Sequence, residues 1–198
     1  MEPIRDRSAD RILKNALELF SSRGYEATSV REICAAAGIT KPTLYHFYGS
    51  KEGVYRALVD GTFERFNAQM DAILELPGTT RAKLQHVARH FFDEVRSDPE
   101  VIRFIMSLLY NPSSAAPPTH FARYYQSHQE RVAACLEAGV ARRELCAGPT
   151  RTRLLLFMGG IGECMCGYLI TGQPELTPEL ADSLVDTLLG DWSAPKTA

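Results

Sequence analysis

The segment from Thr28 to Lys51 constrains the fold most, because it holds two short helical patterns separated by a glycine. In the first pattern, apolar residues recur with the i, i+3, i+4, i+7 spacing of one buried helix face: Val30, Ile33, Cys34 and Ala37. Gly38 stands where this helix must end, because glycine enters the left-handed backbone region without a side-chain clash. Pro42 is tolerated in a first helical turn, so the second helix is predicted to begin near Lys41.

The second helix carries its hydrogen-bonding residues outward. Leu44 and Phe47, three residues apart, form its inward face. The side chains of Thr43, Tyr45 and His46 lie near or on the other face. A helix, a short turn containing glycine and a second helix with polar residues outward is the geometry that presents a recognition helix to the DNA major groove. A helical hairpin in any all-α protein is the alternative that the geometry alone leaves open.

The residues from Gly38 to Glu52 closely resemble the recognition segment of the TetR family, the tetracycline-repressor-like bacterial regulators. The two preceding helices match the family in order and spacing, through the segments 16–20, 24–25, 28–30 and 36–38 and through Ile33. The resemblance covers about residues 8 to 60 and is highly specific there. Beyond that span, only the general plan of the family carries over, because its C-terminal domains diverge with their ligands.

The helical patterns of the whole chain agree with an all-α fold. Proline and glycine breakers at 77–78, 97–99, 111–118, 147–149 and 172–178 separate helical stretches at about 80–97, 99–110, 118–139, 150–171 and 178–192. A support helix at 9–22, the two helices of the motif and a long helix at 51–76 complete a set of about nine. The starts at Pro99 and Pro178 are best defined, because each combines a cap residue, a proline and an acid in the first turn.

Three parts are therefore expected. Residues 1–50 form a DNA-binding domain with the helix-turn-helix motif at about 29–48. A connecting helix occupies 51–76, and residues 77–198 form a helical effector-binding and dimerisation domain. The resemblance implies that the two last helices, 150–171 and 178–192, build a two-fold four-helix dimer interface; a monomer core is the alternative for them.

Charge limits how the chain can bind nucleic acid. The 198 residues are 45% hydrophobic and 23% charged with a net charge of −2, which is ordinary for a soluble globular protein. Residues 1–60 hold 9 Lys and Arg against 8 Asp and Glu, a net charge of +1, which leaves −3 for residues 61–198. Phosphate neutralisation supplies most non-specific DNA affinity. Residues 1–60, called the head below, carry too little positive charge for this, so they depend on specific contacts to DNA and on the pairing of two subunits. A DNA-bending structural protein would need a basic surface.

The N-terminus lacks a basic start followed by an apolar run and a cleavage site, so a cytoplasmic protein is expected. Five cysteines, an odd number without paired zinc spacing, suit reduced thiols. Cys164 and Cys166 raise the alternative of a regulator that senses thiol reagents or soft metals. Residues two apart on a helix diverge by about 200°, however, so packing is the favoured interpretation. We expect no metal site and no cofactor.

Catalysis and membrane insertion fit the sequence less well than DNA binding does. His86 and His90 have the i, i+4 spacing of metal ligands, which would suit a metal-dependent helical enzyme, but a third ligand and every common catalytic motif are missing. We therefore expect no enzyme. The apolar run 154–170 is shorter than the about 20 residues of a membrane span and contains Glu163 and several glycines. A buried helix, with no membrane partner, is the prediction.

The motif and the resemblance together give a set of DNA-contacting residues. Base edges are expected to be approached by Arg31, Lys41, Thr43 and His46, and phosphates to be held by Thr28, Ser29, Tyr45, Tyr48 and Lys51. Thr40, the expected cap of the second helix, completes the set. The partner is double-stranded DNA with an inverted-repeat operator, read by a homodimer.

By analogy with the family, the C-terminal helices are expected to enclose a mainly apolar cavity for a small effector that releases the repressor from DNA. Aromatic and methionine side chains exceed what joining a few helices requires, and a few polar groups among them could orient a guest. The candidate effector-binding residues are Phe91, Phe104, Leu108, Tyr124, Tyr125, His128, Phe157, Met158, Glu163 and Cys164. Ordinary core is the alternative for these residues, and activation of transcription is the alternative to repression.

Overall fold

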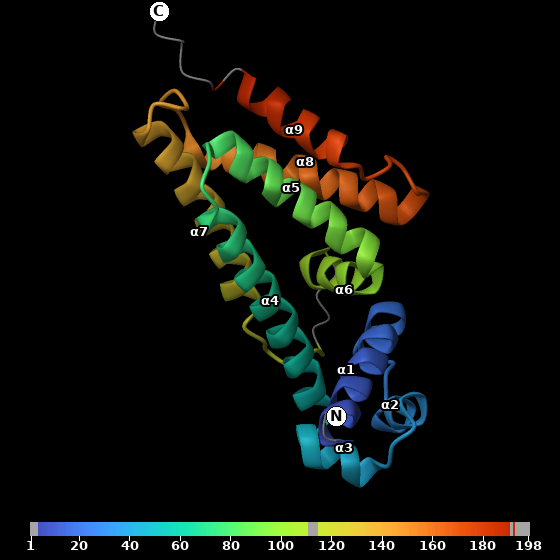
Figure 1. The fold of residues 1–198 in the computed structure, drawn as a ribbon. Coiled ribbons are helices and arrows are strands. Elements are labelled where there is room, and N and C mark those ends of the chain that lie inside the picture. The colour runs from blue at the N-terminus through green and yellow to red at the C-terminus, as the bar shows by residue number, and fades with distance from the viewer. Residues whose placement is uncertain (1–3, 111–114, 191, 193–198) are drawn as a thin grey trace, which may run out of the picture. The chain divides into compact units, whose positions relative to one another are not determined.

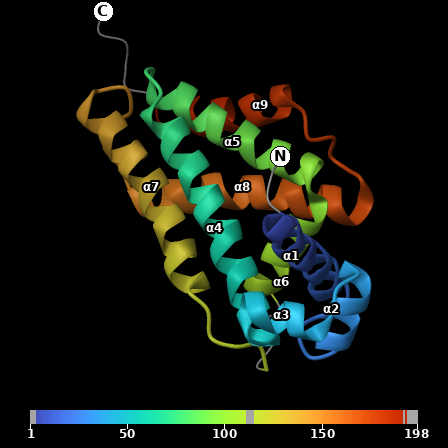
Figure 2. The same ribbon diagram turned by 60° about the horizontal axis from the view of Figure 1, so that its bottom comes forward.

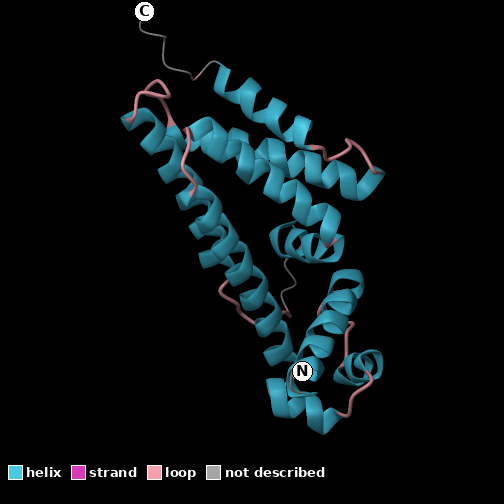
Figure 3. Ribbon diagram, viewed as in Figure 1, coloured by secondary structure: helices cyan, strands magenta, loops and turns pink. Residues whose placement is uncertain are grey.

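A computed structural model describes residues 4–110, 115–190 and 192 of the chain. Within these ranges the regular secondary structure is helical and no strand occurs (Figure 3). The predicted all-α class is therefore confirmed. The predicted breaker at 111–118 falls partly outside the described residues, as does residue 191 of the last predicted helix.

The described residues form nine helices, labelled in Figure 1. They are α1 (Ile4–Arg23), α2 (Val30–Ala37), α3 (Lys41–Tyr48), α4 (Lys51–Glu75), α5 (Thr80–Ser97), α6 (Pro99–Tyr110), α7 (Phe121–Ala141), α8 (Thr150–Thr171) and α9 (Pro178–Gly190). Most bounds agree with the predicted ones within two residues. The support helix begins earlier than predicted, at Ile4. The sequence did not indicate this start, because the first turns are mainly polar and carry no apolar periodicity. The seventh begins later, after the side chain of Thr119 accepts a hydrogen bond from the Phe121 N–H at 3.4 Å.

The chain divides into two compact units. The first contains residues 1–65 and 100–122, and therefore α1, α2, α3, the first part of α4 and nearly all of α6. Its aromatic core joins Phe20 to Tyr55 with ring centroids 5.2 Å apart, and Tyr55 to Phe104 of α6 at 5.6 Å. A hydrogen bond of 2.6 Å from the Ser21 hydroxyl to the Glu100 carboxylate also links α1 with α6.

The second unit contains residues 66–99 and 123–198, with the end of α4, all of α5, α8 and α9 and most of α7. Helices α5, α8 and α9 lie side by side (Figures 1 and 2). Polar side chains align α5 with α9, through a bidentate pair of Arg89 with Asp182 and through Arg81 and Gln85, which both reach Asp186. The residues of α9 that face inward are Ala181, Val185 and Leu189.

A cluster of polar side chains, called the polar hub and formed by Thr80, Arg142 and Glu144, links the start of α5 to the segment after α7. Glu144 accepts hydrogen bonds from the backbone N–H of Thr80 at 2.5 Å and from Arg142 Nε at 2.9 Å. Arg142 also donates to the Thr80 hydroxyl at 3.0 Å. Burial alone would raise the pKa of Glu144, but these hydrogen bonds outweigh it and lower the pKa to about 2. The hub supplies the helix N-terminus with a negative charge, which the helix dipole favours.

Helix α8 is long and apolar enough to cross a membrane by length and composition alone, a test that packed helices of soluble proteins also pass. In the second unit it packs along α5 and α9. Only 22% of its most apolar 18-residue stretch is buried there, so the prediction of a buried helix is wrong for most of this stretch, because α5 and α9 cover only one side of it. The exposed large apolar side chains of this helix are Leu155, Leu156 and Ile170.

Candidate nucleic-acid interface

The geometry of α2, the turn and α3 follows from local sequence signals. Gly38 adopts the left-handed conformation, with φ 60° and ψ 43°, and ends α2. The N–H of Ile39 then donates to the Cys34 carbonyl at 3.0 Å, which closes the helix end. Thr40 caps α3 by accepting a hydrogen bond from the Thr43 N–H at 3.4 Å, and Pro42 lies in the first turn.

One face of the motif is buried and the other is open. Ile33, Cys34, Ala37 and Leu44 are at most 6% exposed, so they fix α2 against α3 and α1. Burial raises the pKa of the Cys34 thiol, as expected for a packing residue. Arg31, Thr40, Lys41, Tyr45 and His46 are exposed, and Thr43 is half-buried. The residues expected to approach base edges thus lie on the open side of the two helices.

Three of the predicted phosphate contacts are engaged inside the first unit. Thr28 is 1% exposed, and its hydroxyl donates to the Gly24 carbonyl at 2.8 Å. The Tyr48 hydroxyl donates to the Ala9 carbonyl of α1 at 3.2 Å. Lys51 donates from Nζ to the carbonyl oxygens of Tyr25 and Thr28, both at 2.8 Å. These side chains therefore hold the backbone next to α2 and α3 in place through internal hydrogen bonds.

Ser29 begins α2 as part of a capping box. Its hydroxyl accepts from the Glu32 N–H at 3.3 Å, while the Glu32 carboxylate accepts from the Ser29 N–H at 2.8 Å. Hydrogen bonds from Ser29 lower the pKa of Glu32. Arg23 pairs with the same carboxylate at 3.1 Å. The cap fixes the first turn of α2, next to Arg31.

Sequence reasoning missed Arg11, which supports the turn of the motif. Its guanidinium donates to the carbonyl oxygens of Ala37 and, at 3.3 Å, Gly38. It thereby satisfies acceptors at the C-terminus of α2, where a cation is also favoured by the helix dipole. The contact joins residues 26 and 27 positions apart, so no local pattern in the sequence reveals it.

The candidate effector residues are distributed over both units. Phe104 and Leu108 lie on α6 in the first unit, and the others lie in the second. The structure brings Phe91 and His128 together around Phe66 of α4, with ring centroids 4.9 Å and 4.7 Å from the Phe66 ring. Phe157 is buried, Tyr124, Met158 and Cys164 are half-buried, and Tyr125 and Glu163 are exposed.

His90 joins the same aromatic cluster, with its ring centroid 5.0 Å from Phe66. Burial lowers the pKa of His128 to about 4, and the charge of Arg131 acts in the same direction. His86, the other residue of the predicted metal-ligand spacing, is exposed on α5. Among the described residues, no group of three or more His, Cys, Asp or Glu side chains could hold a metal ion.

Comparisons with known proteins agree with the geometry of the motif. Residues 12–58 match the family model described as "Bacterial regulatory proteins, tetR family". The chain is 43% identical over 65 residues to the transcriptional repressor ComR of Escherichia coli, a match that covers 33% of this chain and only 31% of ComR. It is 26% identical over 193 residues to the transcriptional regulator EthR of Mycolicibacterium smegmatis, covering 94% of this chain and 84% of EthR.

Among solved structures, the transcriptional regulator FadR of Bacillus subtilis, in complex with stearoyl-CoA, superimposes with a TM-score of 0.75. The two sequences are 18% identical, and the superposition covers 90% of this chain and 96% of the FadR chain. A likeness at this level of identity establishes the fold. It extends the similarity from the motif to the C-terminal helices.

Proposed function

Because the chain belongs to the TetR family of bacterial regulatory proteins, we propose that it is a transcriptional repressor that binds an inverted-repeat operator as a homodimer and is released by a small, mainly apolar ligand. The observation that carries this proposal is the helix-turn-helix unit, in which Arg31, Lys41 and His46 stay exposed beside a buried packing face. In this proposal, residues 1–50 bind DNA, α4 connects, and residues 77–198 bind the effector and dimerise. The regulator works in the cytoplasm and catalyses no reaction.

The DNA contacts divide by what each side chain can reach. Arg31, Lys41, Thr43 and His46 approach base edges, since they share the open side of α2 and α3. Ser29 and Tyr45 contact phosphates, and the exposed Thr40 hydroxyl, 2.9 Å from that of Thr43, orients its neighbour. For Thr28, Tyr48 and Lys51 the proposal is refined by their internal hydrogen bonds: they position the phosphate-binding backbone of the head.

The homodimer is supported by the apolar surfaces of α8 and α9. Leu155 and Leu156 are each 52% exposed, and Leu180, Leu184 and Leu188 form a second, half-exposed stripe on α9. This stripe is separate from the inward residues of α9. Exposed apolar patches of this kind are typical of subunit interfaces. A second subunit doubles the contacts of a weakly charged head and places the two recognition helices about 34–38 Å apart, close to one turn of B-DNA.

The effector proposal rests on the ring cluster of Phe66, Phe91 and His128, and on the likeness to a fold that in FadR binds stearoyl-CoA. Since α4 contributes residues 51–65 to the first unit and Phe66 onward to the second, a ligand that contacts Phe66 contacts the helix that follows the recognition helix. Release requires that the ligand prefer one arrangement of the protein, because equal affinity for both shifts nothing.

Selection from a random pool of double-stranded DNA tests the function. We expect the purified protein to enrich an inverted repeat, with half-sites about one helical turn apart and binding that weakens steeply with salt. Retention of all sequences alike would contradict a specific regulator. Stoichiometric metal together with turnover of a substrate would instead favour the metal-dependent enzyme. Loss of DNA binding on adding soft metals would favour the regulator that senses thiol reagents or soft metals.

A further inference from the structure

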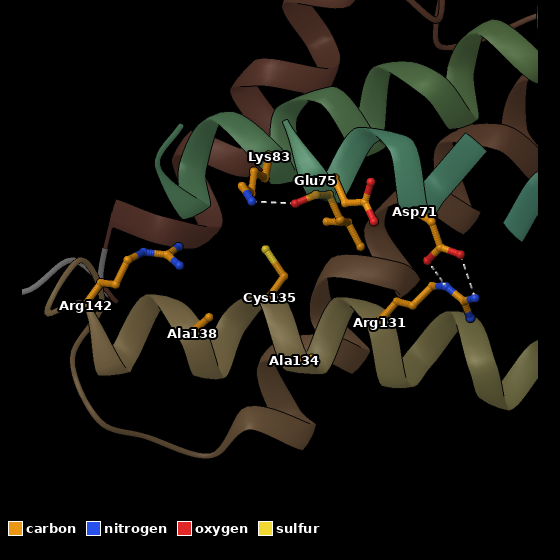
Figure 4. A pocket seen from close by; sticks show the side chains of 9 residues that line it. Asp71, Glu75, Lys83, Arg131, Ala134, Cys135, Ala138 and Arg142 are labelled. Carbon is orange, nitrogen blue, oxygen red and sulfur yellow. Dashed lines mark hydrogen bonds and ion pairs between the residues drawn. The ribbon is translucent and has the colours of Figure 1, made fainter. Parts of the chain in front are cut away.

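A pocket with a volume of about 290 Å³ opens between the end of α4, the start of α5 and α7, within the second unit (Figure 4). Its α4 side is formed by Asp71, Leu74 and Glu75, and its α5 side by Lys83. The third side is formed by Arg131, Ala134, Cys135 and Ala138 of α7 and by Arg142, which directly follows that helix. None of these nine residues belongs to the candidate effector set.

Small residues on α7 create the space. The four α7 residues of the lining have the i, i+3, i+4, i+7 spacing of one helix face, and Arg142 follows in the turn directly after the helix. The three in the middle of this face are Ala134, Cys135 and Ala138, whose short side chains cannot fill the distance to Leu74 on α4. Arg131 stands at one end of this face, and Arg142 lies just beyond the other end. The pocket therefore has an apolar, sulfur-containing floor between charged ends.

The charged groups differ in how far they are already satisfied. Arg131 is occupied by the Asp71 carboxylate and by Ser127. Arg142 donates to Glu144 through Nε and to Thr80 through Nη2, and within the described part of the chain this leaves Nη1 for a ligand. Lys83 donates to one acceptor among the described residues, the Leu74 carbonyl, so two of its three N–H donors remain.

The available donors lie at one end of the pocket. Figure 4 shows Lys83, Cys135 and Arg142 pointing toward the same space. Glu75 lies on the side of Lys83 that faces away from Arg142. Burial raises the pKa of the Cys135 thiol, the charges of Lys83 and Arg142 oppose that rise, and the charge of Glu144 adds to it, so all three charged groups are within electrostatic reach of the floor. Among the described residues, Asp71 pairs with Arg131 and Glu144 with Arg142, and water screens the exposed Glu75, so Lys83 is the cation of this pocket that pairs with no carboxylate.

We propose that this pocket binds a small organic anion, with its anionic group between Lys83 and Arg142 and a short apolar body over Cys135, Ala134 and Ala138. A carboxylate fits this arrangement, because it accepts hydrogen bonds from both cations. The volume is at the lower end of ligand pockets, which limits the occupant to a metabolite of modest size. The site is additional to the effector and DNA sites, and its occupancy requires neither of them.

Hexanoate, hexanamide and inorganic phosphate are the probes, and isothermal titration of the full-length protein is the measurement. We expect hexanoate to bind, hexanamide to bind at least tenfold more weakly because it lacks the charge, and phosphate to bind more weakly because it lacks the apolar body. Equal affinity for hexanoate and hexanamide would overturn the assignment of an anion site. Phosphate binding as tightly as hexanoate would overturn the role of the apolar floor.

Variants locate the binding site. Lys83→Met should weaken hexanoate binding at least tenfold, Lys83→Arg should retain most of it, and Lys14→Met, which removes an exposed lysine from the other unit, should have no effect. Ala138→Phe should abolish binding by filling the pocket. Hexanoate should also slow alkylation of Cys135, followed peptide by peptide by mass spectrometry, without slowing that of Cys166. Unchanged Cys135 alkylation at saturating hexanoate, or unchanged affinity in both Lys83→Met and Ala138→Phe, would overturn the proposal whatever the stability of each variant.

Discussion

The ammonium group of Lys51 lies 4.0 Å from the centre of the Tyr25 ring and donates a hydrogen bond of 2.8 Å to the Tyr25 carbonyl oxygen. The same group donates to the Thr28 carbonyl. It thereby ties the first residue of α4 to the turn that leads into α2. Hydrogen bonds to a charged donor contribute about 1.5–3 kcal/mol when well shielded and less when partly exposed.

Replacing Lys51 should therefore destabilise the head. We expect Lys51→Met to lower the free energy of unfolding by about 1–3 kcal/mol, because two carbonyl oxygens lose their charged donor. Denaturant unfolding followed by circular dichroism measures the loss, and Lys14→Met on the exposed face of α1 is the matched control. A Lys51→Met protein with unchanged stability but a salt slope of DNA binding reduced by about 1 would show that Lys51 is a direct phosphate contact instead.

Acid should destabilise the second unit through His128. Its pKa is lowered to about 4, first by burial and then by Arg131 and His90, against the opposing charge of Asp71. Between about pH 6.5 and pH 4 the unfolded chain therefore binds a proton that the folded chain does not, so stability is present above this range and is lost as the pH falls through it.

The expected loss attributable to His128 is about 2 kcal/mol between about pH 7 and pH 5. His128→Phe keeps an aromatic ring beside Phe66 and removes the titrating group, so its stability should fall less over the same range. The exposed His86→Phe variant is the control and should follow the wild-type curve. Parallel curves for wild type and His128→Phe, measured by urea unfolding at a series of pH values, would argue against a buried neutral histidine.

A charge on the half-exposed stripe of α9 should separate the subunits. A side-chain atom of Leu184 lies 3.8 Å from the position that a Cβ at Gly160 of α8 would take, so both positions belong to one surface. We expect Leu184→Lys and Gly160→Asp to give monomers at micromolar concentration in sedimentation velocity, while Thr187→Lys, at an exposed position of α9, leaves the dimer intact. A wild-type monomer that still bound DNA specifically would contradict the two-subunit account.

Filling the space around Cys164 should remove the response to effector. Cys164 is half-buried on α8, and burial raises the pKa of its thiol, as expected beside packed side chains. Once a screen of apolar and aromatic compounds yields a ligand that stabilises the protein and weakens DNA binding, Cys164→Trp should lose that response and keep operator affinity. If Cys164→Trp responded normally, the effector would bind elsewhere. A ligand that weakens operator binding tenfold must itself bind operator-bound protein tenfold more weakly.

Local signals made the motif predictable. Gly38, Thr40 and Pro42 each act within a few residues of their own position, so the end of α2 and the start of α3 follow from the sequence. The buried Leu44 was also predictable from its spacing. Arg11 escaped prediction because its partners are fixed only by the packing of α1 against α2.

The same limit applies to the other tertiary features. The sequence shows α6 as an apolar helix, but its association with the head depends on the contact of Phe104 with Tyr55. Likewise, Ala134 and Ala138 read as ordinary helix formers, and the pocket beside them arises only when α4 and α5 are placed against α7. Side chains such as Lys51 were assigned to DNA by motif position, whereas their internal acceptors become visible only in three dimensions.

The most direct test of the central claim is the affinity and base preference of the Arg31→Ala protein on the inverted repeat enriched by the wild type. Arg31 is exposed on α2, where the capping box of Ser29 and Glu32 fixes the first turn. We predict a loss of about 1–3 kcal/mol in binding and relaxed preference at one base position of each half-site, with no such change for Arg123→Ala, at an exposed position of α7. If both Arg31→Ala and Thr43→Ala retained wild-type affinity and base preference, the assigned recognition surface would be wrong.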